Sequence, residues 1–189
     1  NENEVNENIK AIGDKYGKID ILVNNAGGLG GRSRFEGMTT EFYRKVMALN
    51  LDSVFFASRA AIPYLKKGSH PTIINFTSNA AWNAGGPGAG IYGTSKAGVH
   101  AITRALAKDL AEYGIRVNAV SPGTIDTPFH AQIKSTKPEV FASWANNIML
   151  GRLGQPQDVA TVVAFLASEE ASFITAETIQ IGGGQALGI

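Results

Sequence analysis

Four short apolar segments alternate along this chain with longer segments of helical pattern, and this alternation restricts the possible folds more than any other feature. The apolar segments are IDILVNNAG (19–27), TIINFTS (72–78), IRVNAVSPG (115–123) and AETIQIGG (176–183). Segments of this length and composition are typical of strands buried on both faces. Strands that alternate with helices pair in parallel, because each helix returns the chain to the edge where the next strand begins. We therefore expect an α/β fold, a mostly parallel sheet with helices on both faces.

The segments between these strands have the period of amphipathic helices. In the third of them, the apolar residues Val99, Ile102, Leu106 and Leu110 recur three or four positions apart, on one helix face. Pro156 suits the first turn of the last helix, because its missing N–H is not needed there. We expect helices at residues 4–17, from Thr40 to Lys67, from Tyr92 to Tyr113 and at residues 155–171.

The chain is expected to form one domain, residues 1–189. Its 189 residues are 44% hydrophobic and 17% charged, which is enough to bury one substantial core. At about residues 128–150 the helical pattern loosens, and we expect this insert to be a mobile lid over a substrate site.

Charge and cysteine content exclude several classes of partner. Seventeen Lys and Arg against sixteen Asp and Glu give a net charge of +1, spread without a basic stripe, so neither nucleic acid nor a membrane surface is an expected partner. No apolar run approaches the roughly 20 residues that span a bilayer. The chain has no cysteine, which fits a reducing compartment such as the cytoplasm.

If the sheet is doubly wound and binds a dinucleotide, it needs a glycine-rich turn between an early strand and its helix. GGLGGR (27–32) has the wrong spacing, and IGGGQALG (181–188) is not followed by a helix. The chain also begins within a helical pattern. We therefore expect that a βαβαβ portion of roughly 60 to 70 residues is missing before it, together with any targeting signal.

Four motifs occur in one order along the chain: NNAG (24–27), Asn50 within ALNLDSVFF, Ser78 followed by Tyr92 and Lys96, and SPGTIDT (121–127). Together they resemble the short-chain dehydrogenase/reductase family, and the resemblance extends from Gly17 through RLGQPQDVA toward the C-terminus. It implies a Rossmann-type doubly wound sheet and hydride transfer between a nicotinamide cofactor and a carbonyl or alcohol. NAD and NADP are not distinguished, because the residue that reads the adenosine ribose would lie in the missing portion.

Tyr92 and Lys96 are the expected acid–base pair. A tyrosine with a pKa near 10 is a slow proton donor at neutral pH, and a cation one helical turn away lowers that pKa. The pair alone fits an ordinary helix turn better, but with the other motifs it favours catalysis. The resemblance implies that Tyr92 exchanges the proton and that Lys96 also binds the nicotinamide ribose.

Ser78 and Asn50 complete the expected catalytic set. Ser78 follows a strand at its carboxyl end and can donate to the substrate oxygen. The interval from Ser78 to Tyr92 is one residue longer than is common in the family, which keeps Thr77 as an alternative. Asparagine is a poor helix former, and the resemblance implies that Asn50 marks a local distortion in a proton relay. The alternative is an asparagine on a solvated face.

The resemblance also implies a set of cofactor contacts. The NNAG turn would lie beside the adenosine ribose, where Ala26 and Gly27 allow close approach, and SPGTIDT would meet the nicotinamide carboxamide. The implied cofactor-binding residues are Asn24, Ala26, Gly27, Tyr92, Lys96, Pro122, Gly123, Ile125 and Thr127.

Candidate substrate residues are less specific. Arg32 and Arg34 follow the NNAG turn, and either can bind a carboxylate through two hydrogen bonds, although most exposed arginines do not. His130 lies in the expected lid. No metal site is expected, since His70, His100 and His130 have no ligand-like spacing.

The expected activity is NAD(P)-dependent reduction or oxidation of a small polar substrate. The VNNAGG turn, the arginine-bearing loop and DTPFH are similar to reductases of sugar-acid ketones such as deoxyhexoseulose uronate. A 3-oxoacyl-carrier-protein reductase is the alternative enzyme, and a non-catalytic cofactor-binding scaffold or regulator is the alternative of another class. Gly182 departs from the acidic residue usual in the family, and Ala176 from a glycine. The resemblance also implies a homotetramer, or a homodimer, formed by helices with alanine faces.

Overall fold

A parallel four-stranded sheet forms the centre of the computed structural model, which describes residues 1–185. The strands lie in the order β1-β2-β3-β4 and are Ile21–Asn24, Thr72–Phe76, Arg116–Pro122 and Thr178–Ile181. Their register pairs Val23 with Ile74, Ile74 with Asn118, and Ala119 with Thr178. The α/β fold expected from the alternating segments is confirmed. The last part of the glycine-rich segment at 181–188 lies outside the described residues, which end at Gln185.

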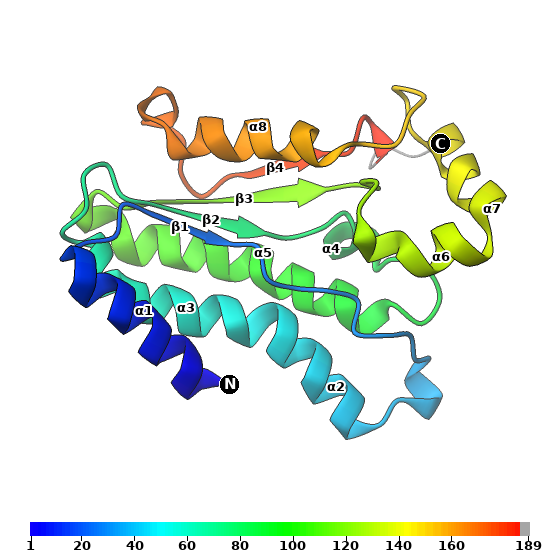
Figure 1. The fold of residues 1–189 in the computed structure, drawn as a ribbon, viewed down its shortest axis with the longest axis horizontal. Coiled ribbons are helices and arrows are strands. Elements are labelled where there is room, and N and C mark those ends of the chain that lie inside the picture. The colour runs from blue at the N-terminus through cyan, green and yellow to red at the C-terminus, as the bar shows by residue number, and fades with distance from the viewer. Residues whose placement is uncertain (186–189) are drawn as a thin grey trace.

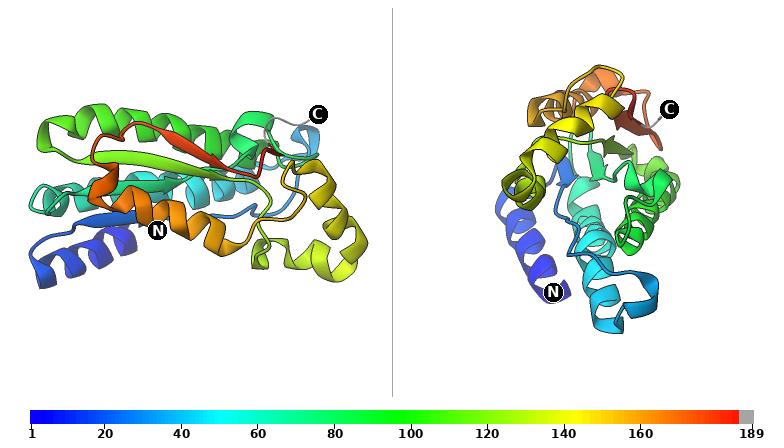
Figure 2. Two further views of the ribbon diagram at one scale, coloured as in Figure 1. Left: turned by 90° about the horizontal axis from the view of Figure 1, so that it is seen from above. Right: turned by 90° about the vertical axis from the view of Figure 1, so that its right-hand side faces the viewer.

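Helices cover both faces of this sheet. Helices α1, α3 and α5 lie on one face, and α8 lies on the other (Figure 1). The two further views in Figure 2 show the same layers from above and from the side. The helices are α1 (Glu2–Tyr16), α2 (Thr40–Met47), α3 (Ser53–Leu65), α4 (Ala80–Asn83), α5 (Gly90–Leu110), α6 (Ala131–Thr136), α7 (Pro138–Ser143) and α8 (Pro156–Ala167).

Two apolar clusters hold the layers together. Neighbouring residues of a strand point to opposite faces, and accordingly Ile73 packs with Leu65 and Val117 in one cluster, whereas Ile74 packs with Leu166 in the other. All five side chains are fully buried. Burying each is worth about 1.5 to 3 kcal/mol.

Some helix boundaries differ from the sequence prediction. The helix expected from Thr40 to Lys67 is α2 and α3 joined by one π-helical turn, Ala48–Asp52. The helix expected at 155–171 ends at Ala167, because Ser168 turns to extended backbone before a separate 3₁₀ turn, Glu169–Ala171. Helix α5 starts at Gly90 and is followed by a 3₁₀ turn.

The insert at 128–150 has more structure than its pattern predicts. It contains the 3₁₀ turns Pro128–His130 and Trp144–Asn147 on either side of α6 and α7. Strand arrows in Figure 1 point toward the end of the molecule where α4, α6 and α7 lie. The insert therefore lies at the carboxyl ends of the strands, while its role as a lid stays a prediction. Within residues 1–185, no helix combines the length and hydropathy needed to cross a membrane.

Candidate active site

A cavity of about 1090 Å³ opens at the carboxyl ends of the strands. Residues from the segment after each strand line it, namely Gly27 after β1, Ser78 after β2, Gly123 after β3 and Gln185 after β4. Parallel α/β sheets bind their ligands at this edge, because the loops between strands and helices diverge there. The cavity is therefore the candidate active site.

Tyr92, Lys96 and Ser78 come together in this cavity. Helix α5 carries Tyr92 and Lys96 one turn apart, and Ser78 follows β2. The Lys96 ammonium donates a hydrogen bond to the carbonyl of Phe76 at 2.8 Å. The hydroxyl of Thr77 donates to the backbone oxygen of Lys96 at 2.8 Å, so this alternative to Ser78 is already engaged within the fold.

Burial changes the pKa of both acid–base groups. It raises the pKa of the Tyr92 phenol, and a hydrogen bond with Ser78 offsets part of that rise. It lowers the pKa of Lys96 to about 8, since a charged ammonium is disfavoured away from water. The expectation that Lys96 lowers the pKa of Tyr92 is not met here, because the shift of Tyr92 is upward and Lys96 is not among its causes.

Asn50 lies in the π-helical turn and is fully buried. Its amide nitrogen donates to the carbonyls of Gly28 and Val46, both at 2.9 Å, and its Oδ1 accepts from the Gly28 N–H at 2.9 Å. The structure thus contains a local distortion at the predicted position. It also contradicts the alternative of a solvated asparagine.

Gly27 brings the NNAG turn against these two side chains. A Cβ on Gly27 would lie 2.8 Å from Asn50 Oδ1, closer than real Cβ contacts, and 3.0 Å from Lys96 Nζ, closer than most of them. The turn therefore favours glycine here. Gly27 and Lys96 line the cavity, and Asn50 is buried behind them.

Asn24, proposed from the motif as a cofactor contact, lies within the sheet and does not line the cavity. Its amide donates to Asn75 Oδ1 at 2.8 Å and to Ser58 Oγ at 3.0 Å. The Asn75 amide then donates to Thr103 Oγ1 at 2.9 Å. Asn24 thus attaches β1 to its neighbours β2 and α3. Ala26, like Asn24, does not line the cavity. The remaining implied contacts all line the cavity, namely Gly27, Tyr92, Lys96, Pro122, Gly123, Ile125 and Thr127.

Of the candidate substrate residues, Arg32 and His130 line the cavity and Arg34 does not. One guanidinium nitrogen of Arg32 donates to the carbonyl of Pro87 at 2.9 Å, and Ser33 N donates to Gly88 O at 3.0 Å. The two glycine-rich loops, 27–33 and 84–90, thus bind each other beside the cavity.

His130 packs among aromatic rings. Its ring centroid lies 5.0 Å from Phe129, 5.7 Å from Phe141 and 5.3 Å from Trp144. Burial lowers the pKa of His130, and the charge of Asp126 offsets part of this. A neutral imidazole is therefore favoured in the cavity lining.

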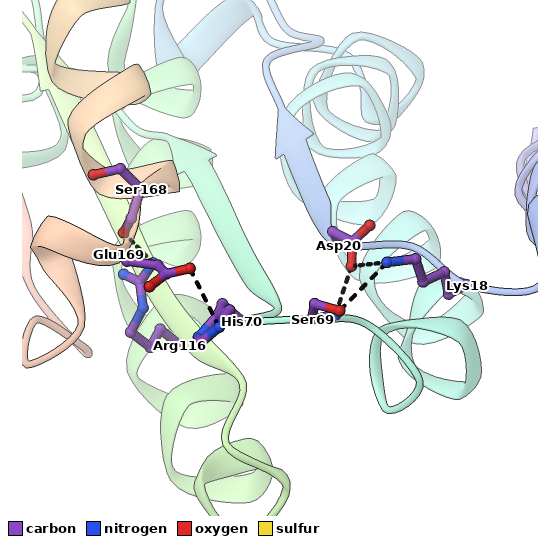
Figure 3. A network of polar contacts seen from close by, with 7 residues as sticks. All are labelled: Lys18, Asp20, Ser69, His70, Arg116, Ser168 and Glu169. Carbon is purple, nitrogen blue, oxygen red and sulfur yellow. Dashed lines mark hydrogen bonds and ion pairs between the residues drawn. The ribbon is translucent and has the colours of Figure 1, made fainter.

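The other two histidines lie elsewhere. His70 Nε2 is 3.3 Å from Glu169 Oε1 at the amino ends of the strands, close to the Lys18–Asp20 pair and to Arg116 (Figure 3). His100 is hydrogen-bonded to Thr178 Oγ1 at 2.9 Å. The three histidines therefore do not converge.

Sequence reasoning missed several polar residues. Asn83, Asn147 and Gln185 line the cavity, and Asn75 and Thr103 form the buried network beneath it. For Asn75 a signal existed, because an amide in the middle of the apolar strand TIINF needs partners. The others lie on different elements, Asn83 at the end of α4, Thr103 on α5 and Asn147 in a 3₁₀ turn, and no sequence pattern connects them.

Comparisons with known proteins agree with this geometry. The model of a family described as enoyl-(acyl carrier protein) reductase matches residues 1–186. The 3-oxoacyl-acyl-carrier-protein reductase FabG of Thermotoga maritima is 40% identical over 181 residues, which are 96% of this chain and 72% of that relative.

Solved structures agree as well. Aldohexose dehydrogenase of Thermoplasma acidophilum superposes with a TM-score of 0.93 at 36% identity, over 100% of this chain and 76% of that one. The NADH-dependent reductase A1-R′ responsible for alginate metabolism superposes with a TM-score of 0.87 at 36% identity, over 98% of this chain and 72% of that one. The chain belongs to the short-chain dehydrogenase/reductase family of NAD(P)-dependent oxidoreductases.

Proposed function

We propose that this protein reduces the carbonyl group of a small, polar, carboxylate-bearing substrate such as a sugar-acid ketone, with NADH or NADPH. The observation that carries the proposal is the convergence of Ser78, Tyr92 and Lys96 in one cavity at the carboxyl ends of the strands. A pure binding scaffold needs no tyrosine, serine and lysine gathered in one cavity, which argues against the non-catalytic alternative.

The residues present fit a nicotinamide cofactor. Gly27 leaves open the space that a side chain would take beside Lys96, and Gly123, Ile125 and Thr127 line the cavity on another side. Lys96 and Thr127 supply donors for ribose and carboxamide oxygens. When bound, the cofactor supplies or accepts the hydride.

The pKa shifts favour Tyr92 as the proton donor in reduction. Because burial raises the pKa of this phenol, it holds its proton at neutral pH until an alkoxide forms beside it. The Ser78 hydroxyl, which offsets part of the rise in the pKa of Tyr92, can donate to the substrate oxygen and so place it next to the phenol. The Lys96 ammonium, while protonated, stabilises the phenolate left after proton transfer.

Charge in the cavity supports an anionic substrate. Arg32 and Lys96 line it, and among residues 1–185 no Asp or Glu does. The guanidinium of Arg32 has five N–H donors, of which one nitrogen is used by Pro87. The similarity to the aldohexose dehydrogenase and to the alginate-metabolism reductase also supports a sugar-type substrate.

A 3-oxoacyl-carrier-protein reductase is the second candidate function, and the 40% identity to FabG of Thermotoga maritima favours it. The complete protein is to be assayed with NADH and with NADPH against deoxyhexoseulose uronate, aldohexoses and a 3-oxoacyl thioester. We expect the highest kcat/KM with the uronate. Preference for the thioester would support the second candidate.

Tyr92→Phe tests the mechanism itself. The variant keeps the ring that packs at 6.1 Å from Phe129 and removes the proton donor, so turnover is expected to fall at least 10³-fold while cofactor affinity stays within about threefold. Wild-type turnover in Tyr92→Phe would refute the role. A wild-type protein that binds cofactor tightly but turns over no substrate would favour the scaffold.

We also propose a homotetramer built on α5. Ala97, Ala101 and Ala105 are exposed along this helix, and small side chains allow close helix packing. Sedimentation of the complete protein as a monomer at micromolar concentration would refute it.

The predicted βαβαβ portion and the cytoplasmic location stay predictions. The exposed fractions of Ile21 and Val23, 48% and 41% on edge strand β1, support the first, since apolar strand faces are usually covered. Reading the complete coding sequence tests it, and cell fractionation tests the second.

A further inference from the structure

The side chain of Gln185, in the segment that follows β4, binds the turn that follows β3. Its Oε1 accepts a hydrogen bond from the backbone N–H of Thr124 at 2.8 Å, and its Nε2 donates to Thr124 Oγ1 at 2.9 Å. The same Oε1 accepts a longer bond, 3.4 Å, from Nδ2 of Asn79, the neighbour of Ser78. One amide thus links the ends of β2, β3 and β4.

The orientation of both amides follows from these bonds. The Thr124 N–H needs an acceptor, which places Oε1 of Gln185 toward it, and Asn79 must then present its Nδ2. Asn79 Oδ1 is buried without a hydrogen-bond partner among residues 1–185. A buried acceptor without a partner costs about 1 to 3 kcal/mol, and the 3.4 Å bond from Nδ2 to Gln185 offsets only part of this cost.

Two glycines make room for this arrangement. A Cβ on Gly123 would lie 2.6 Å from Oε1 of Gln185 and 2.8 Å from the Cα of Gly182. A Cβ on Gly182 would lie 3.1 Å from Nδ2 of Asn79. Gly182, which departs from the acidic residue usual in the family, therefore leaves the space that the Asn79 amide occupies.

The bonded turn carries Ile125 and Thr127, which line the cavity. Backbone bonds to Gly154 already hold this turn, from Gly154 N to Thr124 O at 3.0 Å and from Asp126 N to Gly154 O at 2.8 Å. Gln185 also lines the cavity, and its side chain ties the turn to the strand end that carries Ser78.

We propose that Gln185 is a positioning residue: through Thr124 it holds the turn 123–127 in place for the nicotinamide end of the cofactor, with Asn79 as its support. This inference rests on the proposed function for the identity of the cofactor. The hydrogen-bonded unit itself is a property of the fold and can be tested without turnover.

The test compares Gln185→Leu in the complete protein with Gln180→Leu, an exposed glutamine on strand β4. Loss of the two Thr124 bonds is expected to speed amide hydrogen exchange at 124–127 by roughly 5- to 30-fold. The KM for NADH or NADPH should rise roughly 3- to 10-fold, with the substrate KM and kcat at saturating cofactor within about twofold. Gln180→Leu should change none of these quantities.

A folded Gln185→Leu with wild-type exchange at 124–127 would overturn the proposal. Faster exchange with unchanged NADH and NADPH affinity would overturn the link to the cofactor. If Gln185→Leu does not fold, Thr124→Val takes its place, because it removes the Oγ1 acceptor and should show the same changes in weaker form. If no carbonyl is turned over but both exchange and NADH affinity by fluorescence change as expected, the positioning role stands and the proposed substrate chemistry fails.

Discussion

Replacing Asn50 with alanine should destabilise the protein by about 2 to 3 kcal/mol. The side chain is fully buried and makes three hydrogen bonds, two to Gly28 and one to Val46. Each is worth about 1 kcal/mol net, and the higher helix propensity of alanine returns roughly 0.5 kcal/mol. For a domain of this size such a loss lowers Tm by about 4 to 12 °C.

The measurement is urea unfolding of the complete protein at one fixed concentration, with thermal unfolding beside it. Asn8→Ala is the matched control, because Asn8 is an exposed asparagine on α1 and its replacement should change stability by less than about 0.5 kcal/mol. If Asn50→Ala and Asn8→Ala unfold at the same urea concentration, the three bonds do not stabilise the fold as reasoned. Turnover of Asn50→Ala should also fall, since the turn that carries Gly27 loses its attachment beside Lys96.

Two further predictions concern charge. Arg32→Ala should raise the KM of a carboxylate-bearing substrate by roughly 10- to 100-fold, whereas Arg34→Ala, outside the cavity lining, should change it less than twofold; equal effects would remove Arg32 from the substrate site. The second prediction concerns the pH dependence that Lys96 causes. Burial lowers the pKa of Lys96 from 10.5 to about 8. The folded chain therefore loses this proton above about pH 8, whereas the unfolded chain keeps it up to about pH 10.5. The buried charge therefore costs stability below pH 8, and this cost disappears as the pH rises from 8 to 10.5. Reductive kcat/KM should instead fall above about pH 8 as the ammonium is lost, and a profile that is flat to pH 10 would contradict the role of Lys96.

Most of the fold could be predicted because the spacing of apolar residues along the chain indicates which side chains are buried. The strands around Ile74 and Val117 are apolar runs bounded by turn residues, and α5 shows a regular apolar face, so both were located from the sequence. The apolar spacing of residues 40–67 predicts one continuous helix, so the break between α2 and α3 was indicated only by the family resemblance at Asn50.

The residues of the candidate site likewise fall into those that the sequence located and those that it did not. Ser78, Tyr92 and Lys96 were placed by motif order, and the structure brings them into one cavity. Gln185 was not found, because its partners Thr124 and Asn79 are 61 and 106 positions away in the chain. Hydrogen bonds between side chains of such distant loops leave no local pattern.

The buried amides of Asn24 and Asn75 have a consequence for how the sheet assembles. These two residues face each other in the pairing of β1 with β2, and Asn75 is also bonded to Thr103 on α5. Sliding β1 by one residue would set Val23 opposite Asn75 and separate two amides inside an apolar layer, at a cost of about 1 to 3 kcal/mol for each unpaired group. Apolar parallel strands alone discriminate weakly between neighbouring alignments. The amide pair therefore selects one alignment of the two strands, and with it the position of the Gly27 turn relative to Ser78 to within a single residue.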